Sequence, residues 1–157
     1  MKQLSASPKE VSTLDSHIGF WLRFVSNHVS HRFAARVAAS GVTVAEWVIL
    51  REMFDADVTS PSALASATGL TRGAVSKLVE RLRAKKLLTR VESAQDRRYQ
   101  DVSLTAAGRA LVPQLAAMAD QNDAECFAHL SADQRAQLVS ILKKLIEANK
   151  YNRIPTE

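Results

Sequence analysis

The sequence predicts a mainly α-helical fold that carries one small β-hairpin. Apolar residues recur every three or four positions from Leu14 to about Ala39, which is the period of an amphipathic helix. Capping residues mark the starts of later helices, and residues 87–92 and 99–104 have the pattern of two short strands. The 157 residues suit one compact unit, and an apolar fraction of 46% argues against global disorder.

The first two helices are bounded by a glycine and a capping box. We expect the first helix to stop at Gly41 and the second to begin after Thr43. The side chains of Thr43 and Glu46 can each accept a hydrogen bond from the other residue's backbone N–H. The second helix is expected to turn these residues inward: Val44, Trp47, Val48 and either Leu50 or Phe54.

Residues 60–85 have the pattern of a helix-turn-helix. Ser60 and Pro61 open a short helix to about Thr68, and Thr71 caps a second helix that runs to about Lys85. This unit needs a small residue where its helices touch, a glycine in the turn and apolar residues that lock the second helix. Those requirements are met by Ala65, Gly69, Val75 and Leu78.

A basic hairpin follows at once, which favours a winged helix over a chance helical hairpin. Its tip is the polar loop SAQDRR, residues 93–98, and its second strand alternates polar and apolar residues from Tyr99 to Leu104. Two more helices come after it. Thr105 caps the first of these, within which Pro113 is expected to cause a kink or mark a shifted start. Ser131 and Gln134 cap the last helix, whose apolar face comprises Leu138, Ile141, Leu142 and Leu145.

The pattern divides the chain into three regions. Residues 1–12 are expected to form a flexible arm, and residues 43–104 a winged helix-turn-helix DNA-binding region. Residues 13–42 and 105–150 are expected to form a helical dimerisation region. A narrow apolar face of this kind could also serve a monomer, but the long first helix has little to cover it within one winged helix.

Positive charge is concentrated in one part of the chain. Residues 61–100 carry nine basic and three acidic residues, a net of +6, whereas the whole chain has a net charge of +5. The remaining residues therefore sum to −1. A basic segment in a near-neutral chain is typical of a protein that binds a polyanion, although charge alone would also fit a solvated helix face.

The start of the second helix of the helix-turn-helix, from Thr71 onwards, suits a close approach to DNA. The N-terminal turns of such a helix enter the major groove, where bulk at Gly73 would hold the backbone away from base edges and phosphates. Hydroxyl groups of Thr71 and Ser76 can bond phosphates or bases, although Thr71 could equally be a simple N-cap. The candidate DNA-binding residues in this region are Ser60, Thr71, Arg72, Gly73, Ser76, Lys77 and Arg81.

The segment from Thr43 to Gly108 resembles the MarR family of transcription regulators. The most telling stretch is DRRYQDVSLTAAG, residues 96–108, which is similar to the wing signature of that family. The resemblance implies an obligate homodimer that binds a pseudo-palindromic double-stranded DNA operator. It also implies that Arg98 enters the minor groove and that Asp96 orients it, with Arg97 as the next phosphate contact; the alternative for Asp96 and Arg98 is a plain surface ion pair.

The same resemblance implies a repressor that is released from DNA by a small, possibly aromatic, effector. Trp21, Phe24, His28 and Trp47 could line its pocket, with polar contacts from His17, His31 or Arg32; alternatively these aromatic residues are core and the histidines are surface groups. Cys126 could sense oxidation, but a structural cysteine fits better because the cysteine of redox members lies near the N-terminus. No metal or other cofactor is expected, since His28 and His31 have no obvious third ligand.

Other classes of protein fit less well. The sequence has no glycine-rich phosphate loop, nucleophile motif or apolar carboxylate pair, so we do not expect an enzyme. It also has no secretory signal or membrane-length apolar run, which predicts a cytoplasmic protein without a membrane partner. The alternative function is a winged helix that binds an acidic protein partner.

Overall fold

The structure is a computed structural model that describes residues 11–92 and 100–151. A 3₁₀ turn, η1 (Leu14–Ser16), precedes the helices α1 (Ile18–Ala38), α2 (Val44–Phe54), α3 (Pro61–Thr68) and α4 (Arg72–Ala84). The strands β1 (Leu88–Glu92) and β2 (Gln100–Leu104) follow, and then the helices α5 (Ala106–Cys126) and α6 (Ala132–Asn149). This order confirms the mainly α fold with one hairpin.

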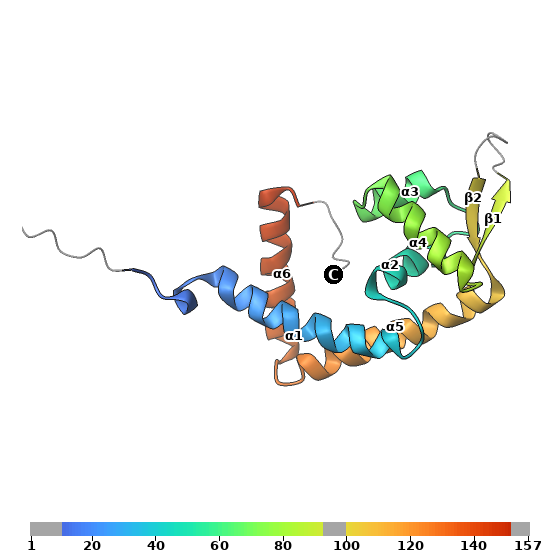
Figure 1. Cartoon of the computed structure of the whole chain (residues 1–157). Coiled ribbons are helices and arrows are strands. Elements are labelled where there is room, and N and C mark those ends of the chain that lie inside the picture. Colours follow the sequence, from blue (N-terminus) through green and yellow to red (C-terminus); the bar gives the residue numbers. More distant parts are fainter. Residues whose placement is uncertain (1–10, 93–99, 152–157) are drawn as a thin grey trace, which may run out of the picture.

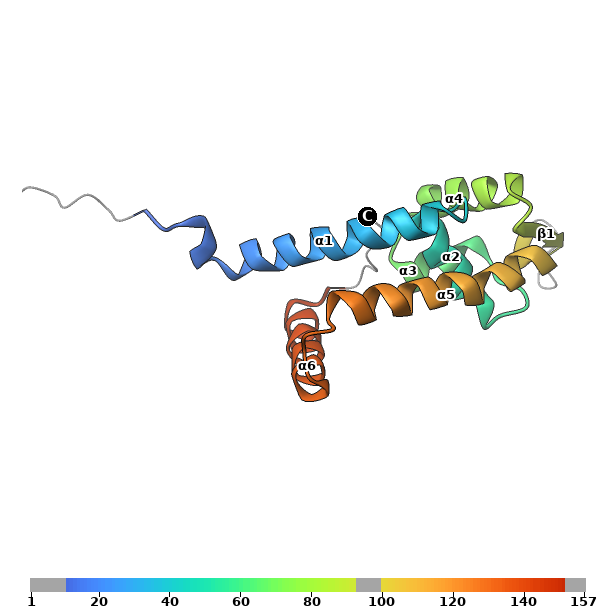
Figure 2. The same ribbon diagram turned by 90° about the horizontal axis from the view of Figure 1, so that it is seen from below.

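The molecule has a compact end and an open end (Figure 1). At the compact end, α2, α3, α4 and the hairpin pack together over the first half of α5. The long helices α1 and α5 lie side by side and lead away from it, and α6 projects from the far end of α5 (Figure 2). No helix within the described segments is both long enough and apolar enough to span a membrane.

The core lies where α2, α4, the hairpin and α5 meet. Ile49, Leu50, Val75, Leu82 and Leu115 are fully buried there. The strands are antiparallel, with Leu88 opposite Leu104 and both side chains in the core. Because side chains alternate along a strand, this register also turns Val102 inward. Almost every helix and strand between residues 44 and 115 therefore contributes side chains to the core of the winged end.

An isolated β-bridge that the sequence did not indicate joins the hairpin to the loop before α3. Thr59, in the loop before α3, donates its N–H to the carbonyl oxygen of Val102 at 3.0 Å and accepts the Val102 N–H at 2.8 Å. The hydroxyl of Ser103 also donates to the Asp57 carbonyl oxygen at 2.7 Å. These bonds hold the wing against the start of the helix-turn-helix.

The expected caps are confirmed. The Thr43–Glu46 and Ser131–Gln134 capping boxes are both formed, and the hydroxyl of Thr105 accepts the backbone N–H of Gly108. Gly41 has a φ of +75°, in the left-handed region that glycine adopts at little cost. Such local features are satisfied within four residues, so the sequence predicts them well.

One expectation about the helices was wrong, and two others were only partly right. The first helix begins at Ile18 rather than Leu14, because the side chains of Ser16 and His17 bond back to the Thr13 carbonyl oxygen and compete with helical bonding. In α2 the expected Leu50 is fully buried, and Val44, Trp47 and Phe54 are partly buried against the core. The rest of the fully buried face is Glu46, Ile49 and Met53, which were not expected there. Of the two alternatives for Pro113, a shifted helix start is contradicted, because α5 runs without interruption from Ala106 through Pro113.

Candidate nucleic-acid interface

The turn between α3 and α4 is built from small and hydroxyl-bearing residues. Gly69 ends α3 with a φ of +67°, and Ala65 is buried between the two helices. The buried hydroxyl of Thr68 donates to the Leu64 carbonyl oxygen at 2.7 Å and accepts the Leu70 N–H at 3.3 Å. The role of Thr68 was not apparent from the sequence. Its two bonds satisfy the backbone of the turn and so hold α4 at a fixed angle to α3.

Helix α4 has one buried face and one exposed face. Val75, Leu78, Val79 and Leu82 point into the core. The predicted DNA-binding residues of this helix lie on the opposite face and are all exposed: Thr71, Arg72, Gly73, Ser76, Lys77 and Arg81. Thr71 is indeed the N-cap, because its hydroxyl accepts the Ala74 N–H at 3.2 Å. The structure therefore brings this predicted group together on one surface.

Gly73 is not required by the fold. A methyl group built on it would meet no atom within 4 Å, and its backbone is helical rather than left-handed. Glycine within a helix costs about 0.5–1 kcal/mol relative to alanine. The fold thus gains nothing from this glycine, whereas a molecule that approaches α4 closely would.

The cations on α4 fall into two groups. The side chains of Arg72, Lys77 and Arg81 form no ion pair or hydrogen bond with any residue that the structure describes. Arg83, in contrast, is bound to Glu80 at 2.8 Å. Exposed cations without a partner along one side of a helix, with Arg72 at its N-terminus, are typical of a phosphate-binding surface.

The remaining predicted DNA-binding residues are Ser60, before α3, and three residues of the wing. Ser60 is half-buried, and its hydroxyl accepts the Ala63 N–H at 3.0 Å as the N-cap of α3. The wing residues Asp96, Arg97 and Arg98 lie outside the described residues.

An ion pair between the buried Glu46 and the partly exposed Lys85 holds the C-terminal end of α4. Glu46 is 1% exposed, and its carboxylate accepts the Thr43 N–H at 2.8 Å and the Lys85 ammonium at 2.6 Å. Lys85 also donates to the Gly41 carbonyl oxygen at 2.7 Å. The sequence identified Glu46 only as half of a capping box. The structure shows that it also ties the end of α4 to the turn between α1 and α2.

The predicted effector residues fall into two separate clusters. Trp21, Phe24 and His28 lie along one part of α1 with Phe20, and the rings of Phe24 and His28 are 4.8 Å apart. Trp47 instead contacts Phe33, with ring centroids 6.5 Å apart. His17 bonds the Thr13 carbonyl oxygen. Within one chain, Trp47 therefore has no ring contact with the other three.

The interface between α1 and α5 contains polar groups that the sequence did not single out as a set. Arg32 and Arg36 of α1 both bind Glu125 of α5 at 2.5 Å. A hydrogen bond from Gln121 is the largest cause that lowers the Glu125 pKa below its usual value, and the two arginines add to it. Nearby, Asn122 is buried and donates to the Val29 carbonyl oxygen at 3.3 Å, but its Oδ1 has no partner among the described residues.

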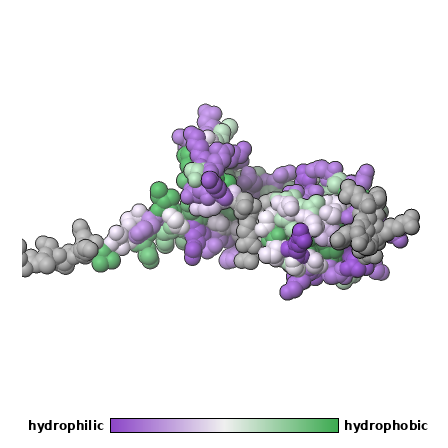
Figure 3. Space-filling model, turned by 90° about the horizontal axis from the view of Figure 1, so that it is seen from above, coloured by the Kyte–Doolittle hydropathy of each residue, from purple (hydrophilic) through white to green (hydrophobic). Residues whose placement is uncertain are grey.

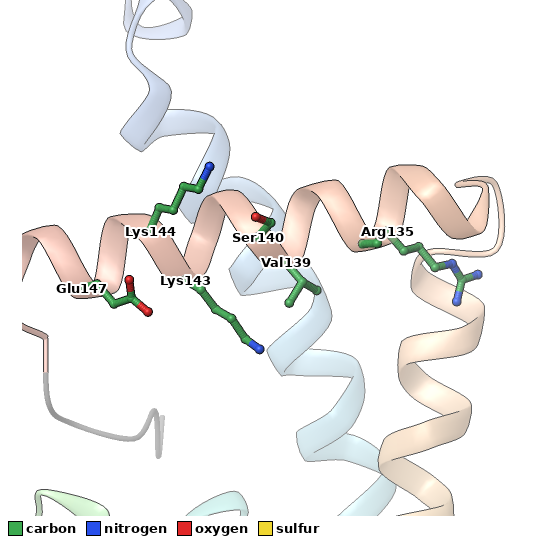
Figure 4. A pocket seen from close by; sticks show the side chains of 7 residues that line it. Arg135, Val139, Ser140, Lys143, Lys144 and Glu147 are labelled. Carbon is green, nitrogen blue, oxygen red and sulfur yellow. The ribbon is translucent and has the colours of Figure 1, made fainter.

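The open end of the molecule exposes a large apolar surface. Space-filling colours show apolar residues along the N-terminal half of α1 and beside α6 (Figure 3). Trp21 is 52% exposed, Phe24 53% and Ile146 47%. An open hollow of about 650 Å³ runs along α6, lined by residues of that helix alone. Its charged groups include Lys143, Lys144 and Glu147 (Figure 4), and the predicted aromatic residues do not line it.

Known proteins are similar to this chain in sequence and in fold. A sequence model of the MarR family matches residues 40–98, from the α1–α2 turn into the wing. The solved structure of BpsR from Bordetella bronchiseptica superposes with a TM-score of 0.77 and 30% identity, covering 86% of this chain and 96% of BpsR. The chain belongs to the MarR family.

Two curated relatives extend this comparison over most of the chain. The transcriptional repressor NicR of Pseudomonas putida is 26% identical over 93% of this chain and 94% of its own length. The transcriptional repressor Rv2887 of Mycobacterium tuberculosis is 28% identical over 83% and 94%, respectively. For a MarR-family winged helix, α4 is the recognition helix and the β1–β2 hairpin is the wing.

Proposed function

We propose that this MarR-family chain is a sequence-specific repressor that binds double-stranded DNA as a homodimer. The observation that carries the proposal is the exposed face of α4, which has three cations without a partner among the described residues and a glycine that the fold does not need. The names of NicR and Rv2887, both transcriptional repressors, support the direction of regulation. BpsR is described as a protein whose DNA binding is regulated, which supports DNA as the partner.

The DNA contacts would be divided between α4 and the wing. On α4, Arg72, Lys77 and Arg81 would bind phosphates or guanine, while Thr71 and Ser76 would donate hydroxyl bonds. Gly73 would let the backbone approach the groove, and Ser60 would contact the adjacent phosphate. In the wing, we propose that Arg98 enters the minor groove beside Asp96 and that Arg97 binds the backbone.

The homodimer would form through the open end of the molecule. The apolar faces of α1 and α6 include Ile18, at 76% exposure, and Ile141, at 49%, and α6 has no buried residue within one chain. Exposed apolar surface of this extent favours a protein contact. We therefore assign residues 13–42 and 105–150 to the dimerisation region and residues 43–104 to DNA binding, with residues 1–12 as an arm.

We further propose that a small aromatic effector controls DNA binding. BpsR is described as regulated by 6-hydroxynicotinic acid, which is such a compound. The cluster of Trp21, Phe24 and His28 on α1 could stack an aromatic ring, and Trp47 lies in a separate cluster with Phe33. The Oδ1 of Asn122, which has no hydrogen-bond partner in the described part of the chain, could accept a hydrogen bond from the effector or a bound water. Titration of the protein–DNA complex with 6-hydroxynicotinic acid tests this part, and unchanged DNA binding would exclude that compound.

The decisive experiment is selection of bound duplexes from a random DNA pool, followed by sequencing. A dimeric reader should enrich a pseudo-palindrome with half-sites about one helical turn apart. Sedimentation should give a dimer at micromolar concentration. Salt-sensitive binding without any enriched sequence would show only non-specific attraction to DNA phosphates. That result would favour an acidic protein partner instead.

The arginine proposed at the wing tip has its own test. Arg98→Ala should weaken binding to the enriched duplex by about tenfold, the loss of one good groove contact, and leave the melting temperature unchanged. Fluorescence anisotropy at fixed salt measures the affinity. If the affinity of the variant equals that of the wild type, Arg98 is not part of the site.

A further inference from the structure

Glu80 is the one acidic residue of α4, and it lies on the exposed side of the recognition helix. Its carboxylate accepts two hydrogen bonds from Arg83, at 2.8 and 3.1 Å, and one from Arg90 on β1. The three side chains are each between 34% and 51% exposed. Glu80 therefore joins the recognition helix to the first strand of the wing with a single carboxylate.

The strand register explains why Arg90 reaches this carboxylate. Leu88 and Arg90 lie on the same face of β1, because side chains alternate along a strand. Leu88 is buried in the core, and Arg90 lies opposite the buried Val102 of β2. Arg90 therefore lies on the core-facing side of the strand, and its guanidinium binds the Glu80 carboxylate of α4.

The stability of the fold does not account for this arrangement. Exposed ion pairs contribute little to the free energy of unfolding. A carboxylate on a DNA-facing helix also opposes phosphate binding, which is a cost to affinity. A shared carboxylate can, however, hold two guanidinium groups in one geometry and keep them from binding arbitrary phosphates.

We propose that Glu80 is a positioning residue for DNA recognition, which fixes the wing relative to α4 and restrains Arg83 and Arg90. The inference rests on the proposed function, because it takes α4 as the DNA-reading helix. Without Glu80, the two arginines bind any nearby phosphate. Affinity for all duplexes then rises, while the preference for the operator falls.

The first test compares Glu80→Gln with Glu92→Gln. Glu92 lies on β1, the strand of Arg90, where it is exposed and has no ion pair with the described residues. Both variants remove one negative charge, so they change the net charge equally. Both should bind scrambled DNA more tightly, but only Glu80→Gln should lower the ratio of operator to scrambled affinity, by about fivefold or more. The melting temperature of Glu80→Gln should stay within about 2 °C of the wild type. Equal ratios in the two variants would show a charge effect alone and would overturn the proposal.

A double-mutant cycle tests whether Glu80 acts through Arg90. In an Arg90→Met background, Glu80→Gln should change the affinity ratio much less than it does in the wild type. Fully additive effects would overturn the proposed coupling.

Hydrogen exchange without DNA separates this proposal from the proposed function. Amides of β1 should exchange faster in Glu80→Gln than in Glu92→Gln, because the strand has lost its tie to α4. Unchanged exchange would overturn the positioning role even if the protein is a DNA reader. A wild-type protein without sequence preference would instead refute the proposed function, and with it the role in recognition.

Discussion

Replacing Gly73 with alanine should stabilise the protein and weaken its function at the same time. The added methyl group meets no atom of the chain within 4 Å, so the fold has room for it. Alanine is favoured over glycine within a helix by about 0.5–1 kcal/mol. Near the helix N-terminus we expect up to about that gain, which corresponds to a rise in melting temperature of roughly 1–4 °C for a chain of this size.

The same methyl group would stand between α4 and DNA. Disruption of one good base contact costs about 1–3 kcal/mol, so the affinity for the operator should fall at least about tenfold. A homodimer carries the substitution in both half-sites, which increases the loss. Binding to scrambled DNA depends on phosphate charge and should change much less.

Gly19 provides a matched control for this substitution. It is the second residue of α1, as Gly73 is the second residue of α4, and a methyl group on it also meets nothing within 4 Å. Gly19→Ala should therefore raise the melting temperature similarly without changing operator affinity, while sedimentation checks that the oligomeric state is kept. Circular dichroism gives the melting temperature, and fluorescence anisotropy at fixed salt gives the affinity.

Two results would refute this reasoning. If Gly73→Ala binds the operator as tightly as the wild type does, the first turn of α4 does not approach the DNA closely. If Gly73→Ala melts at a lower temperature than the wild type, the glycine serves the fold after all.

Three further substitutions test the support of the site. A methyl group on Gly108 would overlap the Leu87 carbonyl oxygen, so Gly108→Ala should lower the free energy of unfolding by about 2 kcal/mol or more, measured by urea denaturation. Lys85→Met leaves the buried Glu46 carboxylate without its cation and should cost about 1–3 kcal/mol, less than a fully buried pair would, because Lys85 is 37% exposed; an unchanged midpoint would contradict this. The lowered pKa of Glu125 contributes stability above the usual glutamate pKa that is lost as the pH falls through the lowered value. Glu125→Gln should therefore make unfolding less dependent on pH between about pH 7 and pH 3, and an equal slope in both proteins would refute it.

Local features of this fold could be predicted from the sequence because their bonds close within a few residues. The capping box of Thr43 and the left-handed turn at Gly69 depend on side chains and dihedral angles next to them. The exposed face of α4 follows from the period of its apolar residues. By the same logic the break at His17 was foreseeable, since Ser16 and Thr13 form a local turn that competes with a helix.

Contacts between distant residues could not be predicted in the same way. Lys85 binds Glu46 from 39 positions away, and Thr59 pairs with Val102 across the winged helix. Glutamate is usually a surface residue, and the sequence spacing does not show that Lys85 reaches Glu46. The expected inner face of α2 was therefore centred on residues away from Glu46. A charged residue can face the core only where its partner also reaches it, and sequence spacing does not reveal that partner.

Helix α1 shows most directly what a periodic pattern leaves open. Its apolar residues recur with one period along the whole helix, yet Val37 is fully buried and Ile18 is 76% exposed. The difference arises from the neighbours, because α2 and α5 cover the C-terminal part and no described element covers the N-terminal part. The pattern identifies a surface that should be buried, and the fold of one chain identifies the portion still unburied. That remaining portion is continuous with the side of the molecule from which α6 projects, so a second copy would bury both with one two-fold interface.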